Sequence, residues 1–418
     1  MHLPDSDSED ELPPGWEERV TVDGSVFYAN HLNKQTQWTH PRTGKKKVVC
    51  GELPFGWERC IDKNTGKVIY IDHENKRTTY TDPRLAFAVE EKEHVNDYRQ
   101  RYDASSTALQ VLHGKDLNGK QALITGANAG IGYETARSLS RHGCNIIFAC
   151  RNINSANEAI KNIRNEKPDS SNTLDVVELD LQCLRSVIHF ANTINKKYKR
   201  IDILILNAGV LGLPYTRTED GFEATFQVNH VSQFLLTILL KPLLTVGSRV
   251  VIVSSESHRF SNLTVENMTA SHLSPESASN YWDMVSYNNS KLCNVLFARQ
   301  LAKKWQSAGI SVFSLHPGNM VSSNLARNWW LYRLAYALVR PFTKSLQQAA
   351  STTIFCATAN ELNGVTGVYF NNCYRCEESK AASNDQLAIA LWNLSLSMIK
   401  NIVGNEIDLT SLESDIKS

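Results

Sequence analysis

The sequence lacks an apolar run long enough to cross a bilayer. Its longest apolar stretch, residues 329–342, is interrupted by Arg333 and Arg340 and is shorter than the roughly 20 residues that a spanning helix needs. The first four residues and the acidic stretch 5–11 lack the basic start and apolar segment of a secretory signal peptide. We therefore expect neither a transmembrane segment nor a secretory leader.

Cysteine is sparse and is not arranged as a disulfide framework. The nine cysteines are scattered and odd in number, which is typical of a reducing compartment. Cys373 and Cys376 form one Cys-x-x-Cys pair without a second pair or a histidine partner. We interpret both as free thiols and expect no metal site.

Charge of one sign is also missing. The chain has 44 Lys+Arg against 43 Asp+Glu, for a net charge of +1, so whole-chain charge gives no reason to expect direct binding of nucleic acid or of a membrane surface. The 418 residues, 42% of them hydrophobic, are enough for two or three domains with a sizeable core. The organisation that we predict is an acidic tail (1–11), two repeated units (12–45 and 53–86), a linker (87–116), a large domain (117–400) and a C-terminal tail (401–418).

The two repeated units are each about 30 residues long, too short for helical repeats. Each begins Leu-Pro-x-Gly-Trp-Glu, continues as short alternating strands with turn signals, and ends on a proline, Pro41 or Pro83. This pattern predicts two small three-stranded antiparallel β-sheets. The spacing from tryptophan to proline resembles the WW domain family.

That resemblance implies a small core on one face of each sheet and a peptide-binding surface on the other. A polyproline helix is already extended, so docking it on aromatic rings costs little ordering entropy. The core of the first unit would comprise Trp16, Tyr28 and Pro41. The residues that would bind a Pro-Pro-x-Tyr ligand are the clamp, Phe27 and Trp38, and a tyrosine pocket, Ala29, His31 and Lys34.

The second unit keeps the core but departs from the clamp. Its core residues would be Trp57, Tyr70 and Pro83, whereas the clamp positions carry Ile69 and Tyr80. Loss of the indole should weaken proline recognition, so we interpret this unit as a folding partner of the first or as a weak binder.

The segment that joins the two units contains three consecutive lysines, Lys45 to Lys47. It is either a solvated linker or a nuclear localisation signal. The connector that follows the second unit lacks clear periodicity and has room for a short helix.

The large domain alternates strand and helix patterns. A buried strand at 122–125 is followed by a helix at 130–141 and a strand at 145–150. Further strand patterns lie at 174–178, 203–206, 249–253, 310–315 and 366–370. This alternation predicts an α/β fold with a doubly wound parallel sheet of the Rossmann type.

Tyr287 and Lys291 lie four residues apart in a run, 286–305, with helical apolar periodicity. Residues at this spacing project from the same face of a helix. An ammonium beside a phenol favours the phenolate, which suits proton exchange with an alcohol or a carbonyl. The alternative is a solvated helix face, because the pair alone is a weak signal.

A glycine-rich turn upstream strengthens the functional interpretation. Such glycines let the backbone approach a pyrophosphate, which the N-terminus of the next helix faces. The turn lies between the first predicted strand and its helix and comprises Thr125, Gly126, Ala127, Asn128, Ala129, Gly130, Ile131 and Gly132.

Together these features resemble the short-chain dehydrogenase/reductase family, from about residue 119 to the C-terminal helix. The resemblance implies catalytic roles for Asn229, Ser255, Tyr287 and Lys291, of which Ser255 would also orient the substrate. Cofactor contacts would come from the glycine turn, Tyr287, Lys291, and from Asp180, Leu181, Asn207, Ala208, Gly209, Pro317 and Gly318.

Two departures from the family pattern matter. Ser255 and Tyr287 are much further apart than the usual dozen or so residues, so we expect an insertion at about 261–283. The threonine usual after Pro-Gly is replaced by a serine, either Ser322 or Ser323. A serine can still hydrogen-bond a carboxamide.

Arg151 ends the second strand, where folds that prefer NAD carry an acidic residue. A guanidinium suits a 2′-phosphate through charge-assisted hydrogen bonds. The Ala-Cys-Arg sequence also resembles the retinol-dehydrogenase branch of the family. We therefore expect NADP(H), with NAD(H) as the alternative.

The segment 329–336, rich in tryptophan and tyrosine, occupies the place of the family's substrate lid. It is either such a lid, which would indicate a hydrophobic steroid- or retinoid-like alcohol or ketone, or a core, interface or membrane-surface helix.

The two resemblances in one chain imply an oxidoreductase targeted by its WW units. The partners would be Pro-Pro-x-Tyr proteins, including transcriptional regulators, in the cytoplasm and nucleus, with the mitochondrion as a further compartment. Roles in apoptosis and tumour suppression would follow. The alternative is an adaptor whose dehydrogenase domain binds cofactor with little turnover.

Overall fold

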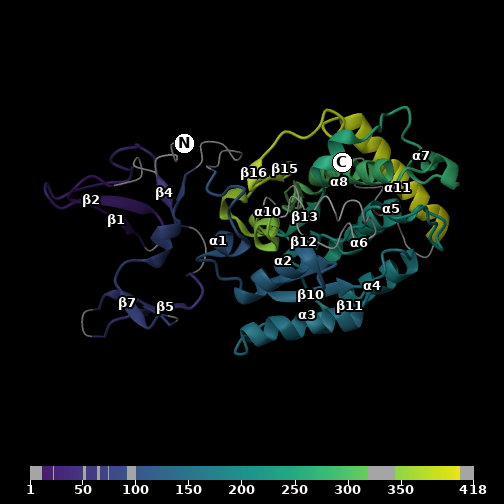
Figure 1. Cartoon of the computed structure of the whole chain (residues 1–418). Helices are drawn as coiled ribbons and strands as arrows, with labels where there is room; N and C mark the ends of the chain where they lie inside the picture. Colours follow the sequence, from purple (N-terminus) through teal and green to yellow (C-terminus); the bar gives the residue numbers. More distant parts are fainter. Residues whose placement is uncertain are drawn as a thin grey trace. The chain divides into compact units, whose positions relative to one another are not determined.

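The computed structural model describes residues 12–21, 23–49, 53–63, 66–73, 75–91, 100–318 and 344–404. These residues form two compact units, which are traced by colour along the chain in Figure 1. The smaller unit comprises the described residues up to 91, with 113–117 and 360–362. The larger comprises 100–112, 118–359 and 363–404. The expected lid, both candidate serines after Pro-Gly, the acidic tail and residues 405–418 lie outside the described residues, whereas residues 401–403, expected in the C-terminal tail, belong to the last helix.

The first small sheet is antiparallel and consists of β1 (Trp16–Val20), β2 (Val26–Asn30) and β3 (Gln35–Gln37), in that order. Alternate residues of a strand face opposite sides. Tyr28 therefore lies on the core side, where it is fully buried, while its neighbour Phe27 faces the other side. Trp16 packs against the same small core, as the WW pattern predicts.

The second small sheet repeats this topology with β5 (Trp57–Ile61), β6 (Val68–Asp72) and β7 (Arg77–Thr79). The buried Tyr70 hydroxyl donates a hydrogen bond to Oδ2 of Asp82 at 2.9 Å. Asp82 also pairs with Arg84 at 2.8 Å and caps a 3₁₀ helix, η1 (Pro83–Phe87). Burial raises the pKa of the Asp82 carboxyl, but the hydrogen bonds from Arg84 and Tyr70 outweigh it and lower that pKa overall.

The segment between the two sheets is only partly the solvated linker that we considered. Lys47 and Val48 form β4, which pairs with β8 (Val89–Glu90), and Nζ of Lys45 lies 2.7 Å from the Glu90 carboxylate. Val49 belongs to the core of the first sheet, and Leu85 and Ala88 pack against that core. Residues on both sides of the second sheet therefore complete the core of the first.

The larger unit contains the predicted doubly wound sheet. Its strands are β9 (Gln121–Thr125), β10 (Asn145–Cys150), β11 (Leu174–Glu178), β12 (Ile203–Leu206), β13 (Arg249–Val253), β14 (Ser311–His316), β15 (Val368–Asn371) and β16 (Tyr374–Arg375). Their order is β11-β10-β9-β12-β13-β14-β15-β16, and every pairing is parallel except β15 with β16. The order reverses between β9 and β12, and such switch points are where doubly wound folds bind nucleotides.

Helices cover both faces of this sheet (Figure 1). One layer comprises α1 (Ala108–Leu112), α2 (Gly130–Arg141), α3 (Ile153–Glu166) and α10 (Leu346–Thr358). The other comprises α4 (Leu184–Lys197), α5 (Ala224–Phe226), the π-helical turn η2 (Gln227–Val231), α6 (Ser232–Leu239), α8 (Asp283–Trp305) and α11 (Asp385–Val403). In this second layer α11 packs along α8, with Trp392 against Phe297 and Phe234. No helix in the described part of the chain is both long enough and apolar enough to cross a membrane.

The residues that separate Ser255 from Tyr287 are short helical turns. They are η4 (Glu256–Phe260), α7 (Ala270–Leu273) and η5 (Ala278–Asn280), whereas a further short turn, η3 (Lys241–Leu243), lies upstream of β13. The turns α7 and η5 lie within the expected insertion at about 261–283, and η4, which precedes it, packs against α8. Cys373 and Cys376, which follow β15, are both free.

Candidate active site

The glycine turn joins β9 directly to α2. Gly126 has a φ of +66°, which a residue with a side chain rarely adopts. A Cβ on Gly132 would lie 2.3 Å from the Gly126 carbonyl oxygen and 2.5 Å from Nδ2 of Asn207. No side chain fits there, so the turn, the helix start and the end of β12 lie in close contact. This is the backbone surface that a nucleotide pyrophosphate requires.

Thr125 links this turn to the predicted Asn207-Ala208-Gly209 segment. Its hydroxyl accepts hydrogen bonds from the backbone N–H groups of Asn207 and Ala208, both at 2.9 Å. The same hydroxyl donates to Oε1 of Gln233 at 3.1 Å, and Gln233 in turn donates to the Ala208 carbonyl at 2.8 Å. Gln233 lies on α6 and thus connects the end of β9 to the loop after β12. The sequence did not indicate this residue.

Asn229 is fully buried in the π-helical turn η2. Its Oδ1 accepts from the N–H of Val210 at 2.8 Å, and its Nδ2 donates to the Val210 carbonyl at 3.0 Å. Nδ2 also donates to Oγ of Ser290 on α8 at 3.0 Å. One side chain thus holds the loop after β12 against α8.

Tyr287 and Lys291 lie on α8 and are only 5% and 4% exposed. The Lys291 ammonium lies 5.6 Å from the centroid of the Tyr287 ring, so the predicted juxtaposition is confirmed and a solvated helix face is excluded. Lys291 donates to the Val253 carbonyl at 3.1 Å. Burial lowers the pKa of Lys291 to about 8.

Gly209 lies against this pair. A Cβ at Gly209 would be 3.3 Å from Oδ1 of Asn229 and 3.4 Å from Nζ of Lys291. The loop after β12 therefore approaches α8 as closely as a backbone can. The predicted residues Asn229, Gly209 and Lys291 meet at one point.

Ser255 follows β13 and is the N-cap of η4. Its Oγ accepts a hydrogen bond from the N–H of Ser257 at 3.2 Å. The preceding Ser254 donates from Oγ to the Lys291 carbonyl at 2.7 Å. This bond ties the end of β13 to α8 and brings the predicted serine alongside the helix of Tyr287.

His258 fixes the backbone of Ser255 from behind. The N–H of Ser379 donates to its Nε2 at 3.2 Å, so Nδ1 carries the proton and donates to the Ser255 carbonyl at 2.7 Å. His258 is buried, and this burial lowers the pKa of its ring. It is a second residue that the sequence did not indicate.

The end of β10 lies next to the glycine turn. Nδ2 of Asn128 donates to Oγ of Ser155 at 3.1 Å, and Asn152 caps α3 by accepting from the N–H of Ser155 at 2.9 Å. Arg151 is exposed and has no ion pair or hydrogen-bond partner within the described part of the chain. Its guanidinium is thus available to an anion near the turn.

The remaining predicted cofactor residues lie at other strand ends. The N–H of Asp180 donates to Oγ of Ser186 at 3.0 Å, and the Leu181 carbonyl accepts from Ser232 at 2.6 Å. Pro317 and Gly318 follow β14, and Gly318 has a φ of +111°. All of these strands are parallel, so their carboxyl ends share the edge of the sheet that carries the glycine turn.

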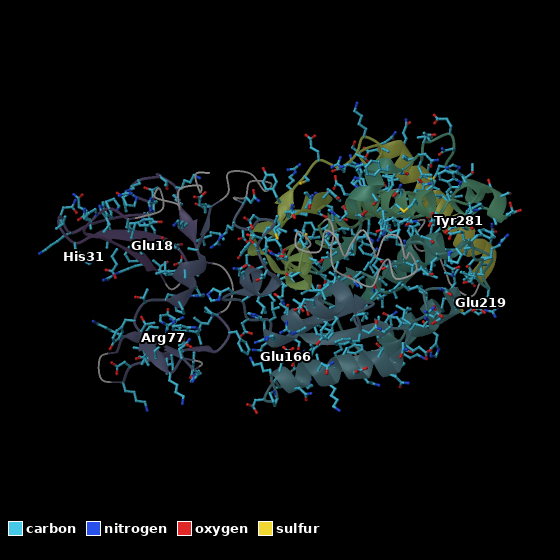
Figure 2. All side chains as sticks on the ribbon, viewed as in Figure 1. Glu18, His31, Arg77, Glu166, Glu219 and Tyr281 are labelled. Carbon is cyan, nitrogen blue, oxygen red and sulfur yellow. The ribbon has the colours of Figure 1, made fainter. Side chains whose placement is uncertain are left out.

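In the smaller unit, the open face of the first sheet carries the predicted clamp. The ring centroids of Phe27 and Trp38 are 5.9 Å apart at an interplanar angle of 62°, and Trp38 is 56% exposed. Beyond the end of β2, Nε2 of His31 (labelled in Figure 2) donates a 2.7 Å hydrogen bond to Oε2 of Glu17. Ala29 is half-buried, and Lys34 is exposed with a φ of +58°.

The second sheet lacks such a pair. Tyr80 is 62% exposed and contacts no other aromatic ring among the described residues. Ile69 is half-buried across from Cys60. The histidine–glutamate contact is repeated in this sheet, where Nε2 of His73 lies 2.9 Å from Oε2 of Glu58.

Known proteins match both parts of the chain. A family model described as short chain dehydrogenase matches residues 120–331, and one described as WW domain matches 12–41 and 53–83. The WW domain-containing oxidoreductase of Drosophila melanogaster is 59% identical over 97% of this chain and 99% of its own length. The human protein of that name is 49% identical over 97% and 98%, respectively.

Two further matches cover a smaller share of the chain. Retinol dehydrogenase 12 of Mus musculus is 39% identical over 68% of this chain and 87% of its own length. A crystal structure of an uncharacterized protein from Mycobacterium paratuberculosis has a TM-score of 0.55 and 29% sequence identity, and covers 72% of this chain and 97% of that one.

Proposed function

Because this chain belongs to the short-chain dehydrogenase family and carries two WW domains, we propose that it interconverts a hydrophobic alcohol and its carbonyl compound with NADP(H). It is an NAD(P)-dependent short-chain dehydrogenase/reductase. The observation that carries the proposal is the buried Tyr287–Lys291 pair, which Asn229 and Gly209 join to the glycine turn. The small residues of that turn leave backbone groups open to a dinucleotide, which fits the cofactor.

Each residue of the group has a chemical task. Bound nicotinamide supplies or accepts the hydride. Tyr287 exchanges the proton with the substrate oxygen, and Ser255 hydrogen-bonds that oxygen. Lys291 provides a positive charge beside the phenol, and Asn229 holds the loop after β12 in place. Loss of such positioned acid–base help typically costs about 10²–10⁴-fold in rate.

Tyr287→Phe tests this assignment because it removes the hydroxyl and nearly preserves the packing. Turnover of a retinoid and steroid panel, with NADPH and NADH, should collapse in the variant while cofactor affinity stays within about twofold. A variant that retains more than half of the wild-type turnover would show that Tyr287 is not the acid–base residue.

The preference for NADP(H) rests on Arg151, which stands where an acidic residue would bind the ribose hydroxyls of NAD. Arg151→Asp should reverse the order of affinities for NADPH and NADH in calorimetric titration. The N-cap of α3, Asn152, is unaffected by that change and can serve as a check of local folding. A wild-type preference for NADH would contradict the proposal.

A hydrophobic substrate is supported by exposed apolar side chains in the segment between Ser255 and Tyr287. Phe260 and Trp282 are each 75% exposed, and Met284 is 38% exposed one helical turn before Tyr287. Large exposed apolar side chains beside a catalytic helix suit an apolar substrate. The relative named retinol dehydrogenase 12 agrees with this class.

The first WW unit is proposed to recruit Pro-Pro-x-Tyr proteins, including transcriptional regulators, in the cytoplasm and nucleus. Its aromatic pair is preformed, so binding requires little reorganisation. The second candidate function is an adaptor with little turnover, which the same preformed clamp favours. Binding of cofactor without turnover of any panel member would support that alternative.

A further inference from the structure

Glu223 is a fully buried carboxylate that the proposed mechanism does not use. It is the N-cap of α5: Oε1 accepts from the N–H of Thr225 and Oε2 from the N–H of Phe226, both at 2.8 Å. A buried charge is costly unless hydrogen bonds satisfy it. The two capping bonds satisfy part of its hydrogen-bonding capacity, since each carboxylate oxygen can accept more than one hydrogen bond.

The same Oε2 atom also accepts a hydrogen bond from Oγ of Ser286 at 2.6 Å. Ser286 lies in the first turn of α8, immediately before Tyr287. A single carboxylate oxygen thus joins the start of α5 to the start of the catalytic helix. Oγ of Ser274 accepts from the backbone N–H of Glu223 at 2.8 Å. Because Ser274 lies in the insertion, this bond connects the insertion to Glu223 as well.

A parallel bridge lies one turn further along α8. Asn229 donates to Oγ of Ser290 at 3.0 Å, and that hydroxyl donates to the Tyr287 carbonyl at 2.7 Å. Ser286 and Ser290 are four residues apart and share one face of α8. Tyr287 and Lys291 each follow one of these serines by a single residue.

Packing and the bond from Ser254 hold α8 against the sheet, and the two bridges on one face, about 5–6 Å apart, further restrict its rotation and its position along its axis. We propose that Glu223 and Ser286 are positioning residues that orient Tyr287 for proton exchange, together with the Asn229–Ser290 bridge. This inference rests on the proposed dehydrogenase function and adds to it residues that do not touch the reacting atoms.

Ser286→Ala tests the proposal most cleanly, because it removes the bridge to α8 and leaves Glu223 capping α5. With all-trans-retinal and NADPH as the probe, kcat should fall about tenfold while KM for NADPH stays within about twofold, as for a misplaced catalytic group. Ser286→Thr keeps the hydroxyl and should restore kcat to within about twofold. Ser279→Ala, an exposed serine of the insertion, is the matched control and should behave as wild type.

Hydrogen exchange of the full-length protein gives a second readout that needs no turnover. In Ser286→Ala, amides 286–291 should exchange at least about fivefold faster, while amides 225 and 226 keep their protection. In Glu223→Gln both groups should lose protection, because an amide donor then faces the N–H groups of α5.

The outcomes separate this inference from the proposed function. If wild type turns over no member of the retinoid and steroid panel, the proposed function fails. The Glu223–Ser286 bridge is then tested by hydrogen exchange alone. Unchanged exchange rates of amides 286–291 in Ser286→Ala would overturn it. If wild type is active, unchanged kcat in Ser286→Ala, or failure of Ser286→Thr to restore it, overturns the positioning role.

Discussion

The two units present their functional groups in opposite ways. In the larger unit Tyr287 and Lys291 are about 95% buried, and hydrogen bonds from Asn229 and the sheet ends hold their surroundings. In the smaller unit Trp38 is 56% exposed and contacts Phe27 at an interplanar angle of 62°, and no side-chain hydrogen bond to another described residue holds it. One site is embedded in the fold, and the other lies on its surface.

The two sites should therefore differ in how much they cost the stability of the unit that contains them. A buried polar site must compete with water for its charged groups, so its residues lower the stability of the fold that holds them. An exposed aromatic face costs little to maintain because it can be altered without opening a cavity. Substitutions in the larger unit should therefore change stability and rate together, whereas those on the open face of the first sheet should change affinity alone.

The largest effect on stability is expected at Lys291. Burial lowers its pKa from 10.5 to about 8, so the folded state disfavours the proton that the unfolded chain keeps. The cost appears as pH falls below about 10.5 and is complete below about pH 8. Lys291→Met removes the burial of this charge, which should raise the free energy of unfolding by about 3 kcal/mol. It also removes one hydrogen bond, which should lower that free energy by about 1 kcal/mol.

At pH 7, urea unfolding of cofactor-free protein should thus show Lys291→Met to be more stable than wild type by about 2 kcal/mol, although turnover is lost. The gap should narrow as wild type gains stability between pH 8 and pH 10. If Lys291→Met is less stable than wild type at pH 7, or if the difference in their free energies of unfolding does not change with pH, the buried charge does not lower the stability of the larger unit.

Trp38→Ala should weaken binding of a labelled Pro-Pro-x-Tyr peptide to the full chain at least tenfold, about 1.4 kcal/mol. Desolvated aromatic anchors carry much of the energy of small interfaces. Because the side chain is exposed, the melting temperature should not change. Fluorescence polarisation and circular dichroism measure the two effects, and a folded variant with unaltered affinity would exclude Trp38 from the clamp.

Leu85→Ala should loosen the first sheet, although Leu85 follows the second sheet in the chain. Its side chain packs against the core of Val26, Tyr28 and Val49, and it is only half-buried, so we expect a loss of about 1 kcal/mol. Amides of β2 should then exchange about fivefold faster. Ile61→Ala, at a position that is 67% exposed, is the matched control. Equal exchange in both variants would show that the two sheets are independent.

Tyr80→Ala should have the smallest effect, with peptide affinity within about twofold of wild type, or less than about 0.4 kcal/mol. Tyr80 has no ring partner of the kind that Phe27 gives Trp38. The same polarisation assay applies. Equal losses for the Trp38 and Tyr80 variants, both folded, would contradict the division of labour between the two sheets.

Much of the fold could be predicted from local patterns. The seven parallel strands are short apolar runs bounded by turn residues, and each was placed within about two residues. The glycine turn and the Tyr287–Lys291 spacing are local as well. Each of these features is made of residues that lie close together in the sequence, so it can be recognised from the sequence alone.

The contacts that hold the site together could not be predicted. Gln233 bonds to Thr125 and Glu223 to Ser286, and each pair is more than 60 residues apart in the chain. Nothing in the local sequence marks a buried glutamine or glutamate as a partner of a distant helix. The pairing of β4 with β8 could not be predicted either, because each of these strands has only two residues and two residues are too few to show a strand pattern.

The central claim is that the larger unit catalyses hydride transfer between bound nicotinamide and a carbonyl compound, with Tyr287 exchanging the proton. The most direct test supplies NADPH deuterated at the transferring position of C4, together with all-trans-retinal, to the full-length protein. We predict retinol that carries one deuterium at the former carbonyl carbon, formed by wild type and absent with Tyr287→Phe. Undeuterated or undetected product from wild type, under conditions where calorimetry shows that NADPH is bound, would contradict the account.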